Sequence, residues 1–228
     1  MALEIKSLKQ NELKRSVAEA TLEHIEHKLN KDTVLGIGTG STVNFFIESL
    51  IHVRHKFDCA VSSSKASTLL LEAGGIKVID LNAAPEIALY VDGADEASLE
   101  KQLIKGGGGA LTQEKIVAQA SEEFVCMIDQ SKLVTTLGAF PLPVEVIPAA
   151  RSLVGRGLKE LNATPIWRES FITDNNNLII DAHDLVITDG KKLESIINDI
   201  PGVVCNGLFS LRPADTLLVS TVEGIDTY

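Results

Sequence analysis

The spacing of hydrophobic residues separates expected helices from expected strands in the first 130 residues. Within 11–29, apolar residues such as Leu13, Val17 and Ile25 recur near helical spacing with charged residues between them, which predicts an amphipathic covering helix. Short apolar runs then alternate with further helical patterns. The expected strands are 33–38, 58–64, 77–81, 87–95 and 124–129, and the expected helices are 41–50, 64–75 and 111–123. Buried strands alternating with helices predict a parallel sheet covered on both faces.

A boundary is expected near residue 140, where Pro141, Pro143 and Pro148 fall within eight residues. The pattern that follows is strand, helix, two strands, helix and strand, which is the order of a ferredoxin-like unit. The expected strands are 143–148, 165–174, 177–184 and 202–210, and the expected helices are 149–163 and 191–200. A last strand candidate, 216–221, is expected to return to the first sheet.

The chain is therefore expected to be an α/β protein with two domains. The main one is a Rossmann-like parallel-sheet domain made of 1–138 plus 212–228. The smaller one, 139–211, is a ferredoxin-like α+β domain that serves as a lid or an interface. No internal repeat or low-complexity segment interrupts this organisation.

Charge and cysteine content narrow the function classes. The 228 residues carry a formal net charge of −10, which opposes attraction to nucleic acid or to an anionic membrane. The first thirty residues lack the apolar core of a signal peptide, and no later run is long enough to span a membrane. Cys59, Cys126 and Cys205 are too scattered for a disulfide framework. A cytoplasmic protein without nucleic-acid or membrane partners is expected.

The first candidate site is the segment GIGTGST, residues 36–42, between a strand and a helix. Glycines allow close approach of an anion, and the N–H groups and hydroxyls that follow can bind phosphate oxygens. The segment is not a P-loop, because no Gly-Lys-Ser/Thr follows. It is also a poor dinucleotide fingerprint, since Ser41 replaces the third glycine. A small-phosphate loop and a simple packed turn remain as interpretations.

The second candidate is VDGADE, with Asp92, Asp95 and Glu96 at the end of an apolar run. Ligands of open α/β sheets bind at the carboxyl ends of strands, so these carboxylates favour substrate binding or catalysis. The alternatives are an exposed acidic turn, which Asp-Gly favours locally, and a divalent metal site. No histidine accompanies the cluster.

The third candidate is KGGGGALTQEK, with Lys105, four glycines and Glu114. Four consecutive glycines increase the entropy of the unfolded chain, so another group is expected to approach this backbone closely. Glu114 is either a first-turn carboxylate favoured by the helix dipole or a general base in a dry pocket. The residues alone leave both interpretations open.

Isolated cations and histidines offer weaker candidates. Lys132, in a turn after 124–129, can add a cation at the same sheet edge or be solvated surface. The pairs His24 and His27, and His52 and His55, have i,i+3 spacing that can hold a metal. Both pairs lie in charged stretches, so no metal site is expected.

Taken in order, these segments resemble ribose-5-phosphate isomerase of type A over nearly the whole chain. The resemblance rests on GIGTGST, SSSKAS, YVDGADE, IKGGGGALTQEKI, the Lys132 turn, FPLPVEVIP, ITDNNNLIID and IPGVVCNGLF. It implies interconversion of ribose 5-phosphate and ribulose 5-phosphate through an enediol intermediate, in the non-oxidative pentose phosphate pathway. It also implies a homodimer or homotetramer that needs no cofactor and no metal.

The resemblance also assigns roles to residues. Glu114 matches the family's proton acceptor, and Asp92, Asp95 and Lys105 match the groups that hold sugar oxygens, assist ring opening and stabilise the enediolate. Lys14 resembles a basic residue that reaches the phosphate. The implied substrate-binding residues are Lys14, Thr39, Gly40, Ser41, Thr42, Asp92, Gly93, Ala94, Asp95, Lys105, Gly106, Gly107, Gly108 and Lys132.

Two rival functions are weighed beside this one. An amino-sugar phosphate isomerase-deaminase shares the broader architecture and would act on glucosamine 6-phosphate. A non-catalytic sugar-phosphate sensor would bind its ligand without turnover. Against the sensor, no helix-turn-helix segment precedes Asn11, while Asp92, Lys105 and Glu114 are all present.

Overall fold

A computed structural model describes the backbone of residues 2–228 and the side chains of residues 10–228. The chain divides into two compact units. Unit 1 consists of Met1–Gly93, Ile116–Leu133 and Ala214–Tyr228, and unit 2 consists of Ala94–Lys115 and Val134–Pro213. The domains expected from the sequence, 1–138 plus 212–228 and 139–211, stay a prediction.

Unit 1 is built on a six-stranded sheet with the order β13-β12-β6-β3-β1-β2. Its strands are β1 (Val34–Ile37), β2 (Cys59–Ser62), β3 (Ile87–Asp92), β6 (Ser121–Asp129), β12 (Thr216–Ser220) and β13 (Ile225–Thr227). All pairings are parallel except that of β13 with β12. The expected return of 216–221 to this sheet is confirmed, because β12 pairs with β6.

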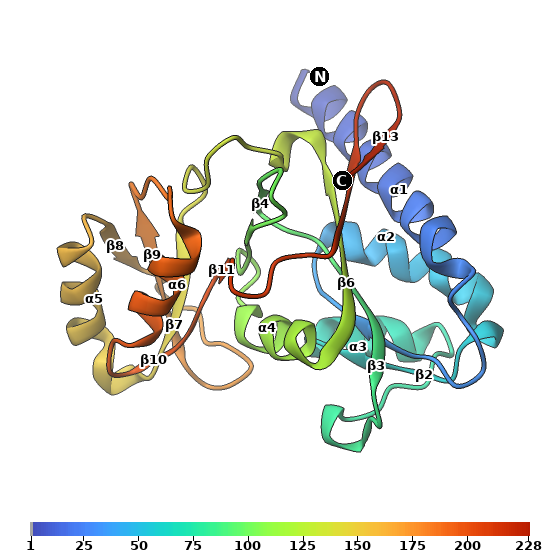
Figure 1. The fold of residues 1–228 in the computed structure, drawn as a ribbon, viewed down its shortest axis with the longest axis horizontal. Helices are drawn as coiled ribbons and strands as arrows, with labels where there is room; N and C mark the ends of the chain where they lie inside the picture. The colour runs from blue at the N-terminus through green and yellow to red at the C-terminus, as the bar shows by residue number, and fades with distance from the viewer. Residues whose placement is uncertain (1) are drawn as a thin grey trace. The chain divides into compact units, whose positions relative to one another are not determined.

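Both faces of this sheet are covered by helices, as the alternation of strands and helices predicts. The helices are α1 (Ala2–Glu26), α2 (Ser41–Leu50), α3 (Lys65–Ala73) and α4 (Leu111–Ala120). On β1, Leu35 and Ile37 belong to a core that includes Phe46 of α2, and α1 packs against α2 (Figure 1). Gly36 lies between these two residues and faces the opposite side of the sheet, where an added Cβ would lie 2.8 Å from Val117 of α4.

Unit 2 contains a four-stranded antiparallel sheet with the order β10-β7-β9-β8. Its elements are β7 (Leu142–Val146), α5 (Arg151–Glu160), β8 (Thr164–Trp167), β9 (Leu178–His183), α6 (Gly190–Asn198) and β10 (Val203–Asn206). Val144 and Ile180 of the sheet share a core with Val154 of α5 and Ile197 of α6. The predicted ferredoxin-like order is confirmed, and with it the α/β fold class.

Three of the expected strands are wrong in extent. The expected strand 165–174 ends at Trp167, because β8 spans only Thr164–Trp167 and the chain then turns through 168–177. Segment 77–81 makes only an isolated bridge between Val78 and Ala60, because Asp80 accepts a hydrogen bond from the amide of Asn82 and starts a 3-10 helix. Segment 202–210 splits at Gly207 into β10 and β11. The amide of Gly207 donates to Pro143, and its carbonyl accepts from Lys105, so the chain leaves one sheet and enters another.

The second sheet of unit 2 was not expected from the sequence. It has the order β11-β5-β4, with β11 (Leu208–Phe209), β5 (Leu103–Ile104) and β4 (Glu96–Ala97). Strands of two residues carry too little pattern to be recognised. They matter because they hold the segment that joins the two aspartates of VDGADE to the glycine run.

Helix α1 is longer than the predicted 11–29 segment at its N-terminal end and ends earlier, at Glu26. The remaining short helices are 3-10 turns at Ile51–Lys56, Leu81–Ala83, Gln130–Lys132 and Pro148–Ala150. None of the described helices combines the length and the hydropathy needed to cross a membrane.

Candidate active site

The candidate residues of unit 1 lie where the strand order of its sheet reverses. Strand β1 is followed in sequence by β2 on one side and lies beside β3 on the other. Ile37 of β1 pairs with Val91 of β3, so both strands end at the same edge. Open α/β sheets bind ligands at such switch points, and Thr39 and Asp92 meet here.

Asp92 holds the turn after β1 in place. Its fully buried carboxylate accepts hydrogen bonds from the amides of Thr39 at 3.1 Å and Gly93 at 2.7 Å, and from the hydroxyl of Tyr90 at 2.5 Å. A Cβ on Gly38 would lie 1.9 Å from this carboxylate. The glycine is therefore required by the close approach of Asp92.

The start of α2 is arranged to receive an anion. Gly40 precedes the helix with φ of +114°, no side chain caps the helix, and its first turn has no acidic residue. The first amides of a helix lack internal partners and carry a partial positive charge. Lys14 of α1 donates a hydrogen bond of 2.9 Å to the Ser41 hydroxyl. These groups together form a candidate phosphate site, with Thr42 in the first turn of the same helix.

Serines of the segment SSSKAS support this turn. Ser64 donates to the Thr39 hydroxyl at 2.9 Å, and Ser67 donates to the Gly38 carbonyl at 2.7 Å. Ser64 also caps α3 by accepting from the Ser67 amide. In the sequence, the run of hydroxyl residues after a strand is the signal that indicates a supporting role for this segment.

Lys132 follows the same edge of the unit 1 sheet. It ends a 3-10 turn that begins after β6, where Asp129 accepts from the amide of Ser131. Because β6 runs parallel to β3, this turn and Asp92 share the carboxyl edge. The structure thus places Lys132 at the edge expected for it.

In unit 2, Lys105 and Glu114 form a buried ion pair. Their Nζ and Oε2 atoms lie 3.4 Å apart, and the side chains are only 3% and 4% exposed. Lys105 directly follows β5, and Glu114 lies in the first turn of α4. The Lys105 ammonium also lies 5.7 Å from the ring centre of Phe209. A carboxylate beside a cation in a dry place is suited to proton transfer with charge stabilisation.

The glycine loop, Gly106–Gly109, is shaped by the protein's own side chains. Asp95 accepts from the amide of Gly107 at 2.8 Å. A Cβ on Gly107 would lie 2.7 Å from that carboxylate, and one on Gly109 would lie 2.1 Å from the ring of Phe171. Gly108 has open space around it. The expected close approach is confirmed, although the groups that approach belong to this chain.

We expect Gly109→Ala to lower the free energy of unfolding. Gly109 has φ of +83°, and a left-handed conformation costs a residue with a Cβ about 1–2 kcal/mol, to which overpacking adds about 1–3 kcal/mol. Urea denaturation should show the loss. Gly108→Ala is the matched control, with an expected change within about 0.5 kcal/mol; equal effects of the two substitutions would contradict the assigned strain.

A buried carboxylate that the sequence analysis did not identify supports the first turn of α4. Glu145 of β7 is fully buried and accepts from the hydroxyls of Thr112 and Thr173 at 2.5 and 2.8 Å. It also accepts from the side-chain amides of Asn175 and Asn177. The segment ITDNNN thus acts through Glu145 on the turn that carries Glu114.

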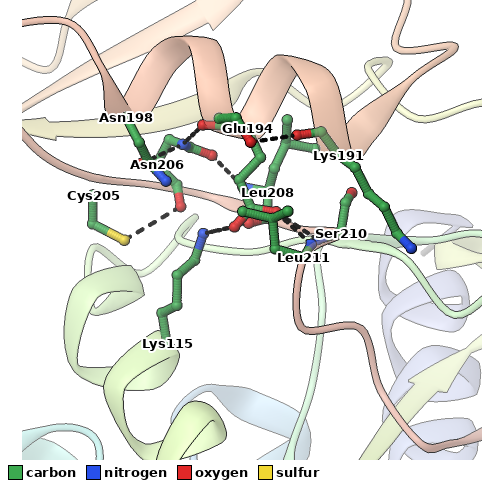
Figure 2. Close-up of polar contacts among 10 residues, drawn as sticks. Lys115, Lys191, Glu194, Asn198, Cys205, Asn206, Leu208, Ser210 and Leu211 are labelled. Carbon is green, nitrogen blue, oxygen red and sulfur yellow. Dashed lines mark hydrogen bonds and ion pairs between the residues drawn. The ribbon is translucent and has the colours of Figure 1, made fainter.

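Lys115 anchors the same turn to α6. Figure 2 shows its side chain reaching Glu194, with an Nζ to Oε1 distance of 2.6 Å, and the carbonyl of Leu208. Glu194 in turn accepts from the amides of Ser210 and Leu211, both at 2.8 Å. The ring centre of Phe209 lies near two ammonium groups, 5.7 Å from that of Lys105 and 4.9 Å from that of Lys115.

The three cysteines are buried and free. Burial raises the pKa of Cys59 to about 11 and raises that of Cys205, so both thiols are protonated at neutral pH. Within the part of the chain whose side chains are described, no three His, Cys, Asp or Glu residues gather as a metal site would require. The absence of a metal in the reaction stays a prediction.

The predicted site residues thus form two groups, one in each unit. In unit 1, Lys14 contacts Ser41, and Thr39 contacts Asp92. In unit 2, Asp95 contacts the glycine loop and Lys105 pairs with Glu114. The chain passes from one group to the other between Gly93 and Ala94.

Comparison with known proteins gives a consistent family. Residues 59–224 match the family described as ribose 5-phosphate isomerase A (phosphoriboisomerase A). The chain is 47% identical to ribose 5 phosphate isomerase A from Neisseria gonorrhoeae, with 96% of each chain covered and a TM-score of 0.91. It is 41% identical to ribose 5-phosphate isomerase A from Methanocaldococcus jannaschii, covering 95% of this chain and 98% of that one, with a TM-score of 0.87.

A third similar structure contains a ligand. It is a D-ribose-5-phosphate isomerase in complex with phospho-erythronic acid, 36% identical to this chain. The match covers 95% of this chain and 97% of that one, with a TM-score of 0.89. The likeness in all three therefore extends over both units.

Proposed function

The chain belongs to the ribose 5-phosphate isomerase A family, and from this premise we propose how its residues interconvert ribose 5-phosphate and ribulose 5-phosphate. The observation that carries the proposal is the buried pair of Glu114 and Lys105 next to the glycine loop. An aldose–ketose isomerase must move one proton between adjacent carbons and stabilise the negative oxygen formed on the way.

Glu114 is the proposed proton carrier. Its carboxylate removes the proton from C2 of open-chain ribose 5-phosphate, and the electron pair of that C–H bond forms the C1–C2 double bond of an enediolate. The same proton returns to C1, while the hydroxyl proton of O2 is transferred to O1. The product is ribulose 5-phosphate, with no net gain or loss of electrons or atoms.

Lys105 and Asp95 are the proposed partners of the sugar oxygens. The Lys105 ammonium lies 3.4 Å from the Glu114 carboxylate, and it would stabilise the charge that develops on the enediolate oxygen. Asp95 and the exposed amide of Gly108 would hold sugar hydroxyls. Asp92 would act mainly through the turn that it holds, since both of its oxygens already accept hydrogen bonds from the protein.

The phosphate would bind at the start of α2. Residues 39–42 supply amides and hydroxyls there, Lys14 supplies a cation next to Ser41, and Lys132 would contribute from the neighbouring turn. Binding energy from this non-reacting group would hold the open-chain sugar in a reactive geometry. A similar D-ribose-5-phosphate isomerase is in complex with phospho-erythronic acid, a phosphorylated ligand, which supports binding of a phosphate group by this chain.

The first experiment is turnover of ribose 5-phosphate by purified protein in the presence of a chelator. We expect chelator-resistant formation of ribulose 5-phosphate and no release of ammonia from glucosamine 6-phosphate. Turnover of glucosamine 6-phosphate would instead support the isomerase-deaminase alternative. Saturable binding of ribose 5-phosphate without turnover would support the sensor.

Location and assembly complete the proposal. A cytoplasmic enzyme is supported by three cysteines that remain free thiols, as in a reducing compartment. A homodimer or homotetramer follows from the family resemblance. Sedimentation of the full chain distinguishes the two assemblies.

A further inference from the structure

Arg168, directly after β8, connects a central strand of unit 2 to the glycine loop. Its guanidinium makes a two-pronged contact with Asp181 of β9, with Nε to Oδ2 and Nη2 to Oδ1 distances of 2.8 and 2.5 Å. Its remaining nitrogen, Nη1, donates to the carbonyls of Gly106 at 3.3 Å and Gly107 at 3.1 Å. One side chain thus joins a rigid strand to two consecutive peptides of the loop.

The peptide between Gly106 and Gly107 is held from both sides. Its carbonyl accepts from Arg168, and its N–H, the amide of Gly107, donates to Asp95. The described chain has no cis peptide bonds, so this carbonyl and this N–H point in opposite directions. The orientation of Asp95 therefore depends on the peptide, and the orientation of the peptide depends on Arg168.

The same geometry applies one peptide further along. Arg168 also binds the carbonyl of Gly107, which turns the amide of Gly108 to the side away from the guanidinium. Gly107 and Gly108 are exposed, so this amide is accessible to a small molecule. Phe171, whose ring centre is 5.4 Å from the Arg168 guanidinium, closes the end of the loop at Gly109.

We propose that Arg168 is a positioning residue for the isomerisation, which holds the glycine loop so that Asp95 and the Gly108 amide are aimed at the sugar oxygens. The inference rests on the proposed function, because it assigns those two groups to substrate. Arginine is required because one planar fork must bind Asp181 and two carbonyls together. A lysine has a single ammonium and cannot reproduce this arrangement.

The variant Arg168→Lys tests the proposal. Arg151→Lys, the same substitution at another position of unit 2, is its control. Arg151 begins α5 and lies over the ring of Trp167, with its guanidinium carbon 4.4 Å from the ring centre. We expect Arg168→Lys to lower kcat for ribose 5-phosphate by up to about 10²-fold, the loss that a misplacement of about 1 Å at a reacting site can cause. Arg151→Lys should stay within about two-fold of the parent.

Two further measurements separate positioning from general loss of structure. Amide hydrogen exchange of the glycine loop should accelerate in Arg168→Lys and not in Arg151→Lys. Guanidinium ion added to Arg168→Ala should restore part of kcat and should have no such effect on Arg151→Ala. Unchanged loop exchange in Arg168→Lys, or a kcat within two-fold of the parent, would overturn the proposal.

The exchange measurement also separates this inference from the proposed function. A parent protein without ribose 5-phosphate turnover would refute the function, while the response of the loop to Arg168→Lys would still report whether Arg168 holds it. The variant Asp181→Asn also tests whether Arg168 holds the glycine loop. It keeps the arginine but weakens its anchor, and we expect a smaller increase in loop exchange than Arg168→Lys causes.

Discussion

Replacing Glu114 by glutamine is expected to lower kcat for ribose 5-phosphate about 10³-fold, within the range of about 10²- to 10⁴-fold attributed to a positioned acid–base group. Glutamine keeps the shape of the side chain but cannot accept and return a proton. Because the phosphate is held elsewhere, substrate binding should change much less than kcat. Steady-state kinetics, together with calorimetric titration of the substrate into the inactive variant, would measure both effects.

Glu194→Gln is the matched control for this substitution. Glu194 is also a buried carboxylate of unit 2 paired with a lysine, with a 2.6 Å contact to Lys115. The variants leave the buried Lys105 and the half-buried Lys115, respectively, without their counter-charges, and both should lose stability. At a temperature where both are folded, the Glu114 variant should lose far more turnover than the Glu194 variant, which removes only an anchor of the turn that carries Glu114. A Glu114→Gln enzyme with kcat within a few-fold of the parent would refute its role as base.

The layered fold could be predicted because it depends on local pattern. The run TVLGIG ends in glycines just before a helix, and this strand–turn–helix unit is what a parallel sheet requires. The predictions were wrong where a single tertiary contact decides the outcome. Gly207 ends a strand because its own amide and carbonyl bond to two different segments, and nothing in VVCNGLF indicates which partners it finds.

In the candidate site too, local pattern predicted some residues, and tertiary contacts decided the others. Thr39 and Asp92 each follow a buried strand, so the sequence could indicate each of them as a candidate site residue, and their contact is a finding of the structure. Glu145 and Arg168 were missed because each acts across elements far apart in sequence: Glu145 contacts Thr112, and Arg168 contacts Gly106. A lone glutamate in a strand and a lone arginine in a loop carry no spacing that would distinguish them from ordinary residues.

Replacing Lys105 by methionine is expected to lower kcat/KM for ribose 5-phosphate by about 10²- to 10³-fold, the range for loss of one donor that stabilises a developing oxyanion. Methionine preserves most of the volume of the buried stem and removes the charge. Lys115→Met is the control, because that ammonium lies near the same Phe209 ring and pairs with Glu194. Equal kinetic losses in the two variants would remove Lys105 from the chemistry.

The free energies of unfolding of these variants show whether the buried Lys105–Glu114 pair is needed for the fold or for the reaction. Removing Lys105 alone leaves the Glu114 carboxylate in a dry place 3.4 Å from where its cation was, and breaking such a pair costs about 3–5 kcal/mol. The double variant Lys105→Met/Glu114→Gln removes both charges and should be more stable than Lys105→Met in urea denaturation, yet it should be inactive. If that recovery is measured, the losses of turnover and of stability have separate causes. The ion pair would then be retained for the reaction, because the fold can do without it.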